Sequence, residues 1–393
     1  MLTMNNHFPG VLSDEYGQDP YKYIDLLDKT ENVIYDKTLN AHLAISYDAV
    51  RSILGNSVLF STKPLSKRAE PVMRGKVLAQ MEGNEHKIKK SMLLHQLTGR
   101  VLKDYYHPKL TNLCDSLLTE IITKNKFDFI SDFGNKYALL TTFNIIGIDY
   151  NKLDWYLERL KLIVQFATGF NLSKETEDIA LFASEELEKV ILDLIDERKK
   201  CAGDDIISFI IHNSNESEIL SDSEIVALSL NILLAASEPV DKVLANCIYH
   251  LYRNESYIDL VISNDCSTNS ILQESLRITP PVHLIPRQVE DDSCVEGVNL
   301  KKGDLIFSLI PSANRDEKYF EHPNTFNPRR EFKGHLSYGV GIHACIGAQF
   351  ANMQLNIALQ KLVLILKNYK EITPPTFGGI YTRGATQYNL ERV

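Results

Sequence analysis

Apolar residues recur at three- and four-residue intervals along much of the chain, which is the spacing of amphipathic helices. The pattern predicts helices at residues 20–30, 47–54, 85–94, 105–123, 132–146, 173–199 and 348–366. Short runs predict a hairpin of 33–35 with 41–46 and further strands at 284–288, 294–298 and 305–309. These proportions predict a mainly α fold with small β-sheets.

A longer helix is predicted at residues 222–253. Ser221 and Glu224 have the spacing of a capping box at its start. Its centre is almost wholly apolar until Ser237 and Glu238, which is typical of a helix that crosses a protein interior. Pro239 has no N–H to donate to the preceding turn, so we expect a kink or a widened turn there.

Composition narrows the class of protein. A chain of 393 residues, 44% of them hydrophobic, can bury a large core, and it shows no linker or internal repeat, so we expect one domain over residues 1–393. The net charge of -9 disfavours nucleic-acid binding. Residues 1–20 are polar, which predicts a soluble cytoplasmic protein without a membrane anchor. Six dispersed cysteines indicate neither a disulfide framework nor a zinc site.

One cysteine has an unusual setting, in Tyr338-Gly-Val-Gly-Ile-His343-Ala-Cys345-Ile-Gly347. Gly339, Gly341 and Gly347 permit positive φ angles, and a helix is predicted to follow at once. Backbone N–H groups of such a loop and a helix N-terminus stabilise a thiolate, which suits a ligand for haem iron. The alternative is a buried structural cysteine in a turn.

The stretch from Tyr338 to Ala351 resembles the cysteine loop of the cytochrome P-450 family, except that the family usually has phenylalanine in place of Tyr338. The resemblance implies the cytochrome P-450 fold and haem b, with Cys345 as the axial ligand of the iron and Gly347 in the haem-binding loop. It also implies a monooxygenase that uses O2. A separate ferredoxin or flavodoxin with its reductase would supply the electrons, because the chain has no flavin or iron–sulfur region.

Other segments extend this resemblance. Glu274 and Arg277 lie three residues apart on a predicted helix, a spacing common in surface ion pairs. With the segment 326–330 they resemble the family's Glu/Arg/Arg network, and Arg330 fits the third position better than Arg329. The resemblance further implies propionate contacts, and the alternative for each residue is an ordinary surface or cap position. The implied contacts are His343, Arg287, His86 and Lys90, with lysine where the family has arginine.

The helix at 222–253 corresponds to the family's distal helix, where oxygen binds and protons are delivered. Alignment places Glu238 at the family's acid and Pro239 at its usual threonine. We expect Glu238 to feed protons through water, with the Ser237 hydroxyl as a second donor, by an atypical route. The alternative for Glu238 is a carboxylate that is solvated or held by a charged partner.

Segments 69–75, 77–81, 280–288 and 381–384 resemble the bacterial pulcherriminic acid synthases, which oxidise the cyclic dipeptide cyclo(Leu-Leu) to pulcherriminic acid. A small neutral substrate of this kind needs an apolar pocket with few polar groups. We expect Arg74 to donate to a substrate carbonyl, and its alternative is a solvated loop arginine. The expected lining residues are Arg74, Met81, Phe166, Phe170, Leu234, Val282 and Ile285.

Three alternatives stay open at this point. A peroxygenase would share the proline at position 239, although those enzymes typically place arginine before it to hold a fatty acid, and here Glu238 would repel one. A hydroxylase could act on another small apolar substrate. A haem-binding sensor or carrier would show no turnover with either reductant or peroxide.

Overall fold

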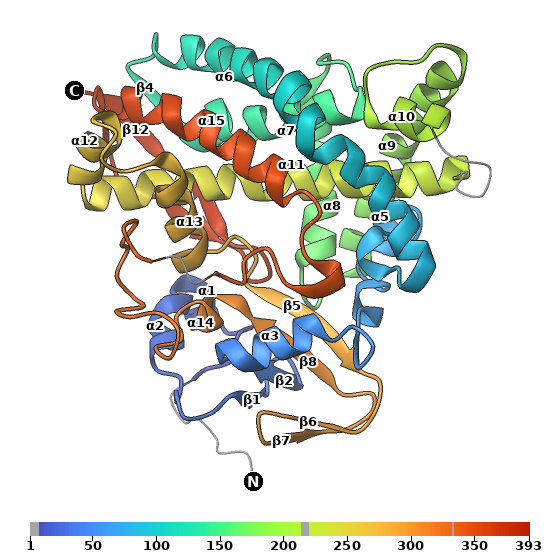
Figure 1. The fold of residues 1–393 in the computed structure, drawn as a ribbon, viewed down its shortest axis with the longest axis vertical. Helices are drawn as coiled ribbons and strands as arrows, with labels where there is room; N and C mark the ends of the chain where they lie inside the picture. The colour runs from blue at the N-terminus through green and yellow to red at the C-terminus, as the bar shows by residue number, and fades with distance from the viewer. Residues whose placement is uncertain (1–7, 214–219, 332–333) are drawn as a thin grey trace. The chain divides into compact units, whose positions relative to one another are not determined.

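The computed structural model describes residues 8–213, 220–331 and 334–393 (Figure 1). The first seven residues of the polar N-terminal segment therefore lie outside the described residues. The helices are α1 Asp14–Gln18, α2 Pro20–Asp25, α3 Tyr47–Gly55, α4 Glu70–Met73, α5 Gly83–Leu97, α6 His107–Ile121, α7 Asn135–Ile146, α8 Leu153–Thr168, α9 Lys174–Lys200, α10 Ile206–Asn213, α11 Asp222–Arg253, α12 Ser256–Ile262, α13 Thr268–Ile278, α14 Ile310–Ala313 and α15 Ala348–Leu366. The strands are β1 Val33–Asp36, β2 Ala41–Ala44, β3 Phe60–Ser61, β4 Lys126–Asp128, β5 Leu284–Val289, β6 Ser293–Val295, β7 Val298–Leu300, β8 Leu305–Leu309, β9 Tyr369–Glu371, β10 Thr376–Gly378, β11 Gly384–Gln387 and β12 Asn389–Arg392. The predicted class, mainly α with small sheets, is confirmed.

The chain divides into two compact units. The sheet unit comprises residues 1–64, 242–345 and 362–393, and the helical unit comprises residues 65–241 and 346–361. The single domain expected from the sequence stays a prediction.

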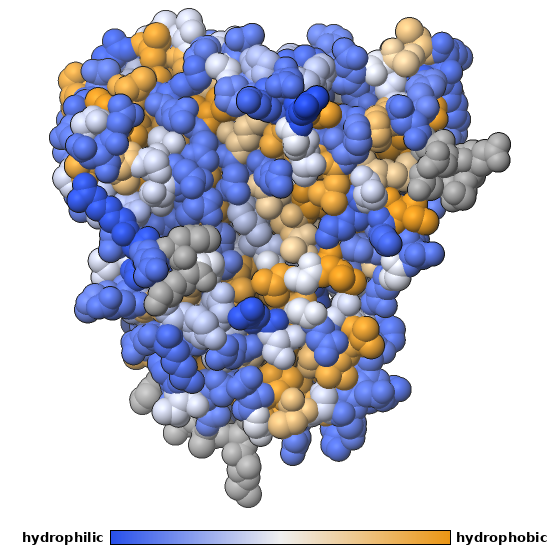
Figure 2. Space-filling view, viewed as in Figure 1, coloured by the Kyte–Doolittle hydropathy of each residue, from blue (hydrophilic) through white to orange (hydrophobic). Residues whose placement is uncertain are grey.

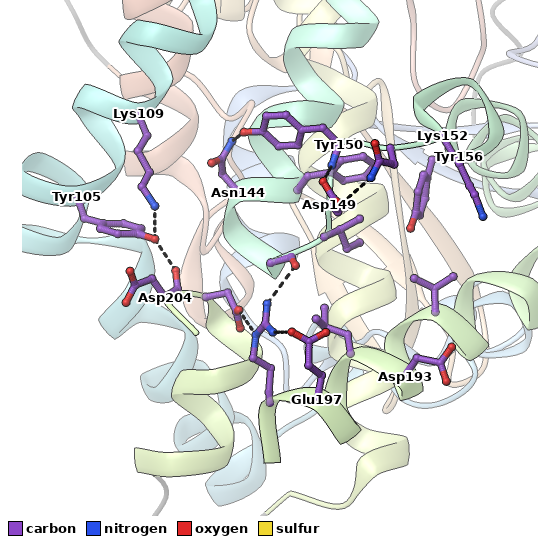
Figure 3. A pocket seen from close by; sticks show the side chains of 18 residues that line it. Tyr105, Lys109, Asn144, Asp149, Tyr150, Lys152, Tyr156, Asp193, Glu197 and Asp204 are labelled. Atoms are coloured by element: carbon purple, nitrogen blue, oxygen red, sulfur yellow. Dashed lines mark hydrogen bonds and ion pairs between the residues drawn. The ribbon is translucent and has the colours of Figure 1, made fainter. Parts of the chain in front are cut away.

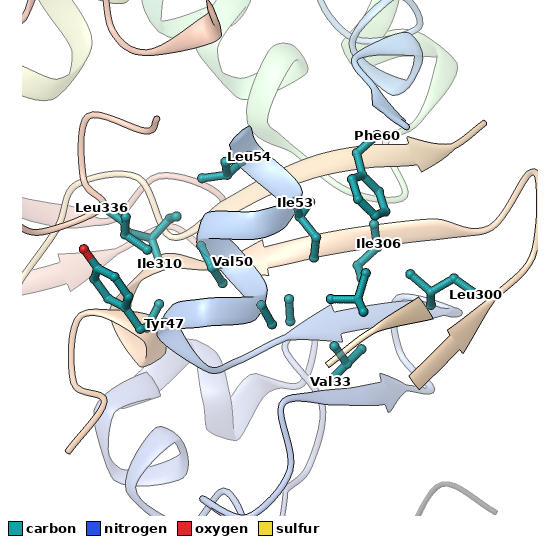
Figure 4. Close-up of a cluster of buried hydrophobic side chains, with 14 of the residues drawn as sticks. Val33, Tyr47, Val50, Ile53, Leu54, Phe60, Leu300, Ile306, Ile310 and Leu336 are labelled. Carbon is teal, nitrogen blue, oxygen red and sulfur yellow. The ribbon is translucent and has the colours of Figure 1, made fainter. Parts of the chain in front are cut away.

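A five-stranded sheet organises the sheet unit, in the order β1-β2-β8-β5-β3. The predicted hairpin is confirmed, since β1 and β2 pair antiparallel, while β2 and β8 pair parallel. Apolar side chains of α3 pack against this sheet, with Val50 and Ile53 beside Phe60 and Ile306 (Figure 4). Their burial follows from the amphipathic period of α3 and orients the helix end toward the segment that carries Cys345.

Two predicted elements in the sheet unit differ from the structure. The helix predicted at 20–30 ends at Asp25, because Asp28 accepts hydrogen bonds from the backbone and hydroxyl of Thr30 in a local turn that competes with the helix. The strand predicted at 294–298 is instead a hairpin of β6 and β7. Glu296 and Gly297 form its turn, both with positive φ, which matches the twist of the paired strands.

The helical unit contains α4 to α10 together with parts of α11 and α15. The helix predicted at 105–123 begins as a π-helical segment, Val101–Tyr106, before α6. Both α8 and α10 were absent from the sequence-based expectation. The predicted bounds of α11 agree with the structure, and its capping box is present, since the Ser221 N–H donates to Glu224 Oε2 at 2.8 Å.

Helix α11 stays helical across Pro239. Of the described helices, it alone has the length and apolar composition to span a membrane, and 44% of its most apolar window is buried. Interior helices of globular proteins share these properties. The face shown in Figure 2 is largely hydrophilic, with hydrophobic side chains distributed between polar ones.

Candidate functional site

Cys345 lies between a 3-10 turn, Gly341–His343, and the start of α15. The Cys345 N–H donates to the Tyr338 carbonyl at 2.8 Å, which closes the loop. Gly339 and Gly341 have positive φ angles of 67° and 76°, as expected. Gly347 does not use this freedom: its φ is not positive, and its carbonyl accepts from the Ala351 N–H at 2.7 Å at the entry to α15.

The loop is held close to the end of α3. A Cβ added at Gly341 would lie 3.1 Å from the Leu54 carbonyl oxygen and 3.2 Å from the Gly55 Cα, so a larger residue there would have to displace backbone. The Cys345 side chain is exposed in the structure, whereas Cys114, Cys247 and Cys266 are buried. The alternative of a buried structural thiol therefore does not apply to Cys345.

Arg287 lies on β5 and is only 5% exposed. Its Nη1 donates to the neighbouring Pro286 carbonyl at 2.8 Å, and its buried Nε has no hydrogen-bond partner among the described residues. Burial lowers the pKa of this guanidinium. A buried cation without a carboxylate is costly, and a charge-assisted hydrogen bond to an anion offsets that cost. This side chain therefore fits a haem propionate.

The other expected propionate contacts are divided between the units. His343 is partly buried in the sheet unit, two residues before Cys345. His86 and Lys90 lie one turn apart on α5 in the helical unit. His86 is buried, and burial, followed by the charge of Lys90, lowers its pKa and favours neutral imidazole. The intervening Lys89 points to other partners and forms ion pairs with Glu85 and Glu224 at 3.0 and 2.7 Å.

The Glu/Arg/Arg network is present and buried. Arg277 donates from Nη2 and Nε to the two oxygens of Glu274 at 2.7 and 2.8 Å, and Arg330 Nε lies 3.3 Å from Glu274 Oε1. Arg330 rather than Arg329 is thus the third member. Arg277 also donates to the carbonyls of Asn314 and Pro323, so the pair fixes the backbone that precedes the cysteine loop. Unlike a surface pair, Glu274 and Arg277 are 5% and 2% exposed.

The middle of α11 is more exposed than the residues next to it. Residues 234–239 are partly or fully exposed, whereas Leu233 and Val240 next to them are buried. The Ser237 hydroxyl donates to the Leu233 carbonyl at 2.5 Å, within its own helix. Pro239 cannot donate to the Ala235 carbonyl. The expected role of Ser237 as a donor would therefore require its hydroxyl to leave this bond. The neighbouring Glu238 is partly buried.

Arg74 is exposed, and it forms an ion pair. It ends α4 in the left-handed region, with φ 59°, and its Nε lies 2.6 Å from Glu188 Oε2 of α9. Phe170, another expected lining residue, has the Arg68 guanidinium 4.4 Å from its ring centre. Sequence reasoning missed Glu188 and Arg68, because neither stands at a local spacing that marks the contact.

The remaining expected lining residues differ in exposure. Met81 is 1% exposed and belongs to the packed interior. Phe166 and Leu234 of the helical unit are partly exposed. In the sheet unit, Val282 bridges to Thr382, and Ile285 pairs with Ser308 two residues before Arg287. Ile285 and Arg287 thus share β5, and Val282 precedes that strand by two residues.

Comparison with known proteins assigns the class. The cytochrome P450 family model matches residues 267–376, a range that includes Glu274 and Cys345. With the relatives that follow, this match shows that the chain belongs to the cytochrome P450 family. It is a cytochrome P450 monooxygenase, and its cofactor is haem with a cysteine axial ligand.

The particular relatives are bacterial. Pulcherriminic acid synthase from Bacillus subtilis (strain 168) is 37% identical over 386 residues, which covers 95% of each chain. Putative cytochrome P450 YjiB from the same organism is 25% identical and covers 92% of this chain and 91% of its own. CYP109E1 from Bacillus megaterium, solved with testosterone, shares the fold with a TM-score of 0.87 at 24% identity, over 97% of this chain and 99% of the other.

Proposed function

We propose that the protein oxidises cyclo(Leu-Leu) to pulcherriminic acid in the cytoplasm, with O2 and with electrons from a separate ferredoxin or flavodoxin and its reductase. The observation that carries this proposal is the 37% identity to pulcherriminic acid synthase, which extends over 95% of both chains. Such coverage extends far beyond residues 267–376, the range that the family model matches. The cytochrome P450 class itself does not depend on this choice of substrate.

The proposal makes Cys345 the haem ligand. The family match contains Cys294 and Cys345, and both are exposed. Cys294 stands on β6 in a hairpin, whereas Cys345 lies in the glycine loop before α15, where backbone N–H groups and the helix N-terminus stabilise a thiolate. When bound, haem supplies the oxygen chemistry of the family.

Four side chains of this protein would bind the haem propionates. Arg287 is the strongest candidate because its guanidinium is buried without a carboxylate among the described residues. His343, His86 and Lys90 complete the set. Lys90 offers a point charge where a guanidinium would offer a planar fork, so its contact is less directional.

Proton delivery falls to Glu238 in this proposal. Its carboxylate is partly buried in the more exposed segment of α11, and a carboxyl group there can pass protons to and from water. Ser237 is a weaker donor because the Leu233 carbonyl already holds its hydroxyl. Pro239 removes the hydroxyl that most of the family would use.

Substrate binding would depend on apolar contacts and few polar ones. Two isobutyl groups suit the aromatic and aliphatic side chains of Phe166, Phe170, Leu234, Val282 and Ile285, with Met81 as packing behind them. Arg74 would donate to a diketopiperazine carbonyl through the N–H groups that Glu188 leaves available.

The test is a visible-spectrum titration of haem-loaded protein with cyclo(Leu-Leu), followed by product analysis with a reductase system. A saturable Soret shift and formation of pulcherriminic acid are expected. Arg74→Ala should weaken the titration while the haem spectrum stays intact. No shift, with a thiolate-type carbon monoxide spectrum still present, would reject the cyclic dipeptide and retain the class. Turnover with hydrogen peroxide alone would favour a peroxygenase.

A further inference from the structure

The segment of residues 69–81, which carries Arg74, is attached to helix α9 at two points. The buried Ser184 hydroxyl donates to the Val72 carbonyl at 2.6 Å. One helical turn further along, Glu188 Oε2 lies 2.6 Å from Arg74 Nε. Both the segment and this part of α9 belong to the helical unit. Helix α9 therefore fixes the backbone of the segment and one end of the arginine side chain that it presents.

The segment is restrained by further contacts. A Cβ added at Gly75 would lie 3.1 Å from the Ala227 Cβ of α11, so the backbone approaches that helix closely. The Gln80 side chain closes the segment on itself, since its Nε2 donates to Glu70 Oε1 at 2.7 Å and its Oε1 accepts from the Val77 N–H at 3.0 Å. The segment is thus held by two helices and by its own side chains.

Helix α9 is itself anchored along its length. Glu186 Oε2 lies 3.0 Å from Arg159 Nε of α8. The last turns of α9 line a groove together with residues of α7 and α8 (Figure 3). There, Arg198 forms an ion pair with Asp205 at 2.5 Å and donates to the Gly147 carbonyl at 3.3 Å. These contacts make α9 a fixed support for the segment.

The backbone of Arg74 adopts a conformation that favours glycine. Its φ is 59° and its ψ 20°, and its N–H donates to the Glu70 carbonyl, which ends α4. A side chain in this left-handed region costs about 1–2 kcal/mol, whereas glycine has no such cost. The arginine side chain therefore needs partners that offset this cost, and Glu188 is one of them.

Glu188 leaves most of the guanidinium available. It contacts Nε, so the N–H groups of the two terminal nitrogens of Arg74 stay free for another acceptor, and the planar group has a fixed direction. The carboxylate also offsets the charge of Arg74, and the two side chains are 23% and 35% exposed. Glu185, another carboxylate that interacts with Arg74, pairs with Lys189 at 3.0 Å. A guanidinium in this setting still donates to a neutral carbonyl, but Glu188 repels a second carboxylate.

We propose that Glu188, acting through Arg74, is a positioning and specificity-determining residue for the substrate. It directs the terminal N–H groups of Arg74 toward a carbonyl oxygen and offsets the charge that would attract an acid. Uncharged amides are thus preferred over carboxylates of the same size. This inference rests on the proposed function, in which Arg74 donates to a carbonyl of the cyclic dipeptide.

The experiment uses two probes that differ in charge, N-acetyl-leucyl-leucinamide and N-acetyl-leucyl-leucine, on the haem-loaded full chain. Isothermal titration calorimetry gives both dissociation constants, and the wild type should bind the amide more tightly than the acid. Glu188→Gln keeps an acceptor for Arg74 Nε and removes the charge. The ratio of the dissociation constants of acid and amide should therefore fall by about 2- to 5-fold, as for a partly exposed charge pair.

Two further variants separate this role from a structural one. Asp178→Asn is the matched control, because Asp178 is an exposed residue of α9 that pairs with Lys174 at 3.1 Å, and it should leave the ratio unchanged. Arg74→Gly suits the left-handed backbone, so this variant should fold and keep its carbon monoxide spectrum. Since Glu188 acts through Arg74, Glu188→Gln should not change the ratio in the Arg74→Gly background.

Three results would overturn the proposal: equal binding of amide and acid by the wild type, an unchanged ratio in Glu188→Gln, or the same fall of the ratio with and without Arg74. The proposed substrate is tested separately by the titration with cyclo(Leu-Leu). If that titration gives no Soret shift while the ratio changes as expected, the cyclic dipeptide is rejected and the selection of neutral ligands by Glu188 is retained.

Discussion

Replacing Arg287 by methionine should weaken haem binding without lowering the free energy of unfolding of the apoprotein. Methionine keeps an unbranched stem of similar length and removes the guanidinium. In the structure this cation is 5% exposed, and its Nη1 donates to the carbonyl of the adjacent Pro286 at 2.8 Å. If a haem propionate is the main partner of Arg287, the substitution will lower the affinity for haem but will not lower the free energy of unfolding of the apoprotein.

The magnitudes follow from the burial. A hydrogen bond between charged groups contributes about 1.5–3 kcal/mol, which corresponds to an affinity for haem lower by about 10- to 150-fold. An uncompensated buried cation costs several kcal/mol in the apoprotein, so its removal should leave the free energy of unfolding unchanged or raised.

Haem transfer to an excess of apomyoglobin measures the affinity for haem, and urea unfolding of the apoprotein measures its free energy of unfolding. Arg329→Met is the matched control, because Arg329 is exposed and outside the Glu274 network, and it should behave as wild type in both assays. Wild-type haem retention in Arg287→Met, together with a loss of apoprotein stability, would refute the reasoning and assign the guanidinium a structural role.

Three further predictions concern other residues. Glu274→Gln should lower the free energy of unfolding by about 3–5 kcal/mol in urea titrations, since it leaves buried guanidinium groups uncompensated, whereas Asp292→Asn at an exposed ion pair should leave it nearly unchanged. Cys345→Ser should abolish the thiolate-type spectrum of the reduced carbon monoxide complex, and Cys294→Ser should preserve it; the reverse result would reassign the ligand. Burial, followed by nearby arginine charges, lowers the pKa of His250 to about 3. His250 in the unfolded chain takes up its proton near pH 6.5, whereas the folded protein keeps it neutral. The free energy of unfolding is therefore unaffected by this residue above pH 6.5 and falls by about 1.4 kcal/mol for each pH unit below it. His250→Asn should reduce the pH slope of the unfolding free energy between pH 6 and 4 accordingly, and an unchanged slope would contradict the assignment.

Much of the helical architecture could be predicted because its causes are local. The bounds of α11 and α15 follow from apolar runs with a capping box or a glycine turn at their start, and the structure has the predicted limits. The hairpin of β1 and β2 is likewise a short-range feature. The prediction was wrong where a local hydrogen bond replaced the helix, as between Thr30 and Asp28. It was also wrong where two positive φ angles turned one predicted strand into a hairpin.

The candidate site shows the same division. The glycine pattern around Cys345 and its resemblance to a known family were visible in the chain itself. The ion pair of Arg74 with Glu188 was not, because 114 positions separate the partners.

Sequence alone therefore determined most of the longer helices, the capping box of α11 and the glycine loop around Cys345, because neighbouring residues suffice to satisfy backbone hydrogen bonds and amphipathic periodicity. Only the tertiary structure decided which charged side chains are buried and which of them form ion pairs. Burial of Glu274 and Arg277 made a common surface spacing into a network, and burial of Arg287 without a carboxylate made it a candidate for haem. Desolvation depends on packing between distant segments, and no local pattern encodes it.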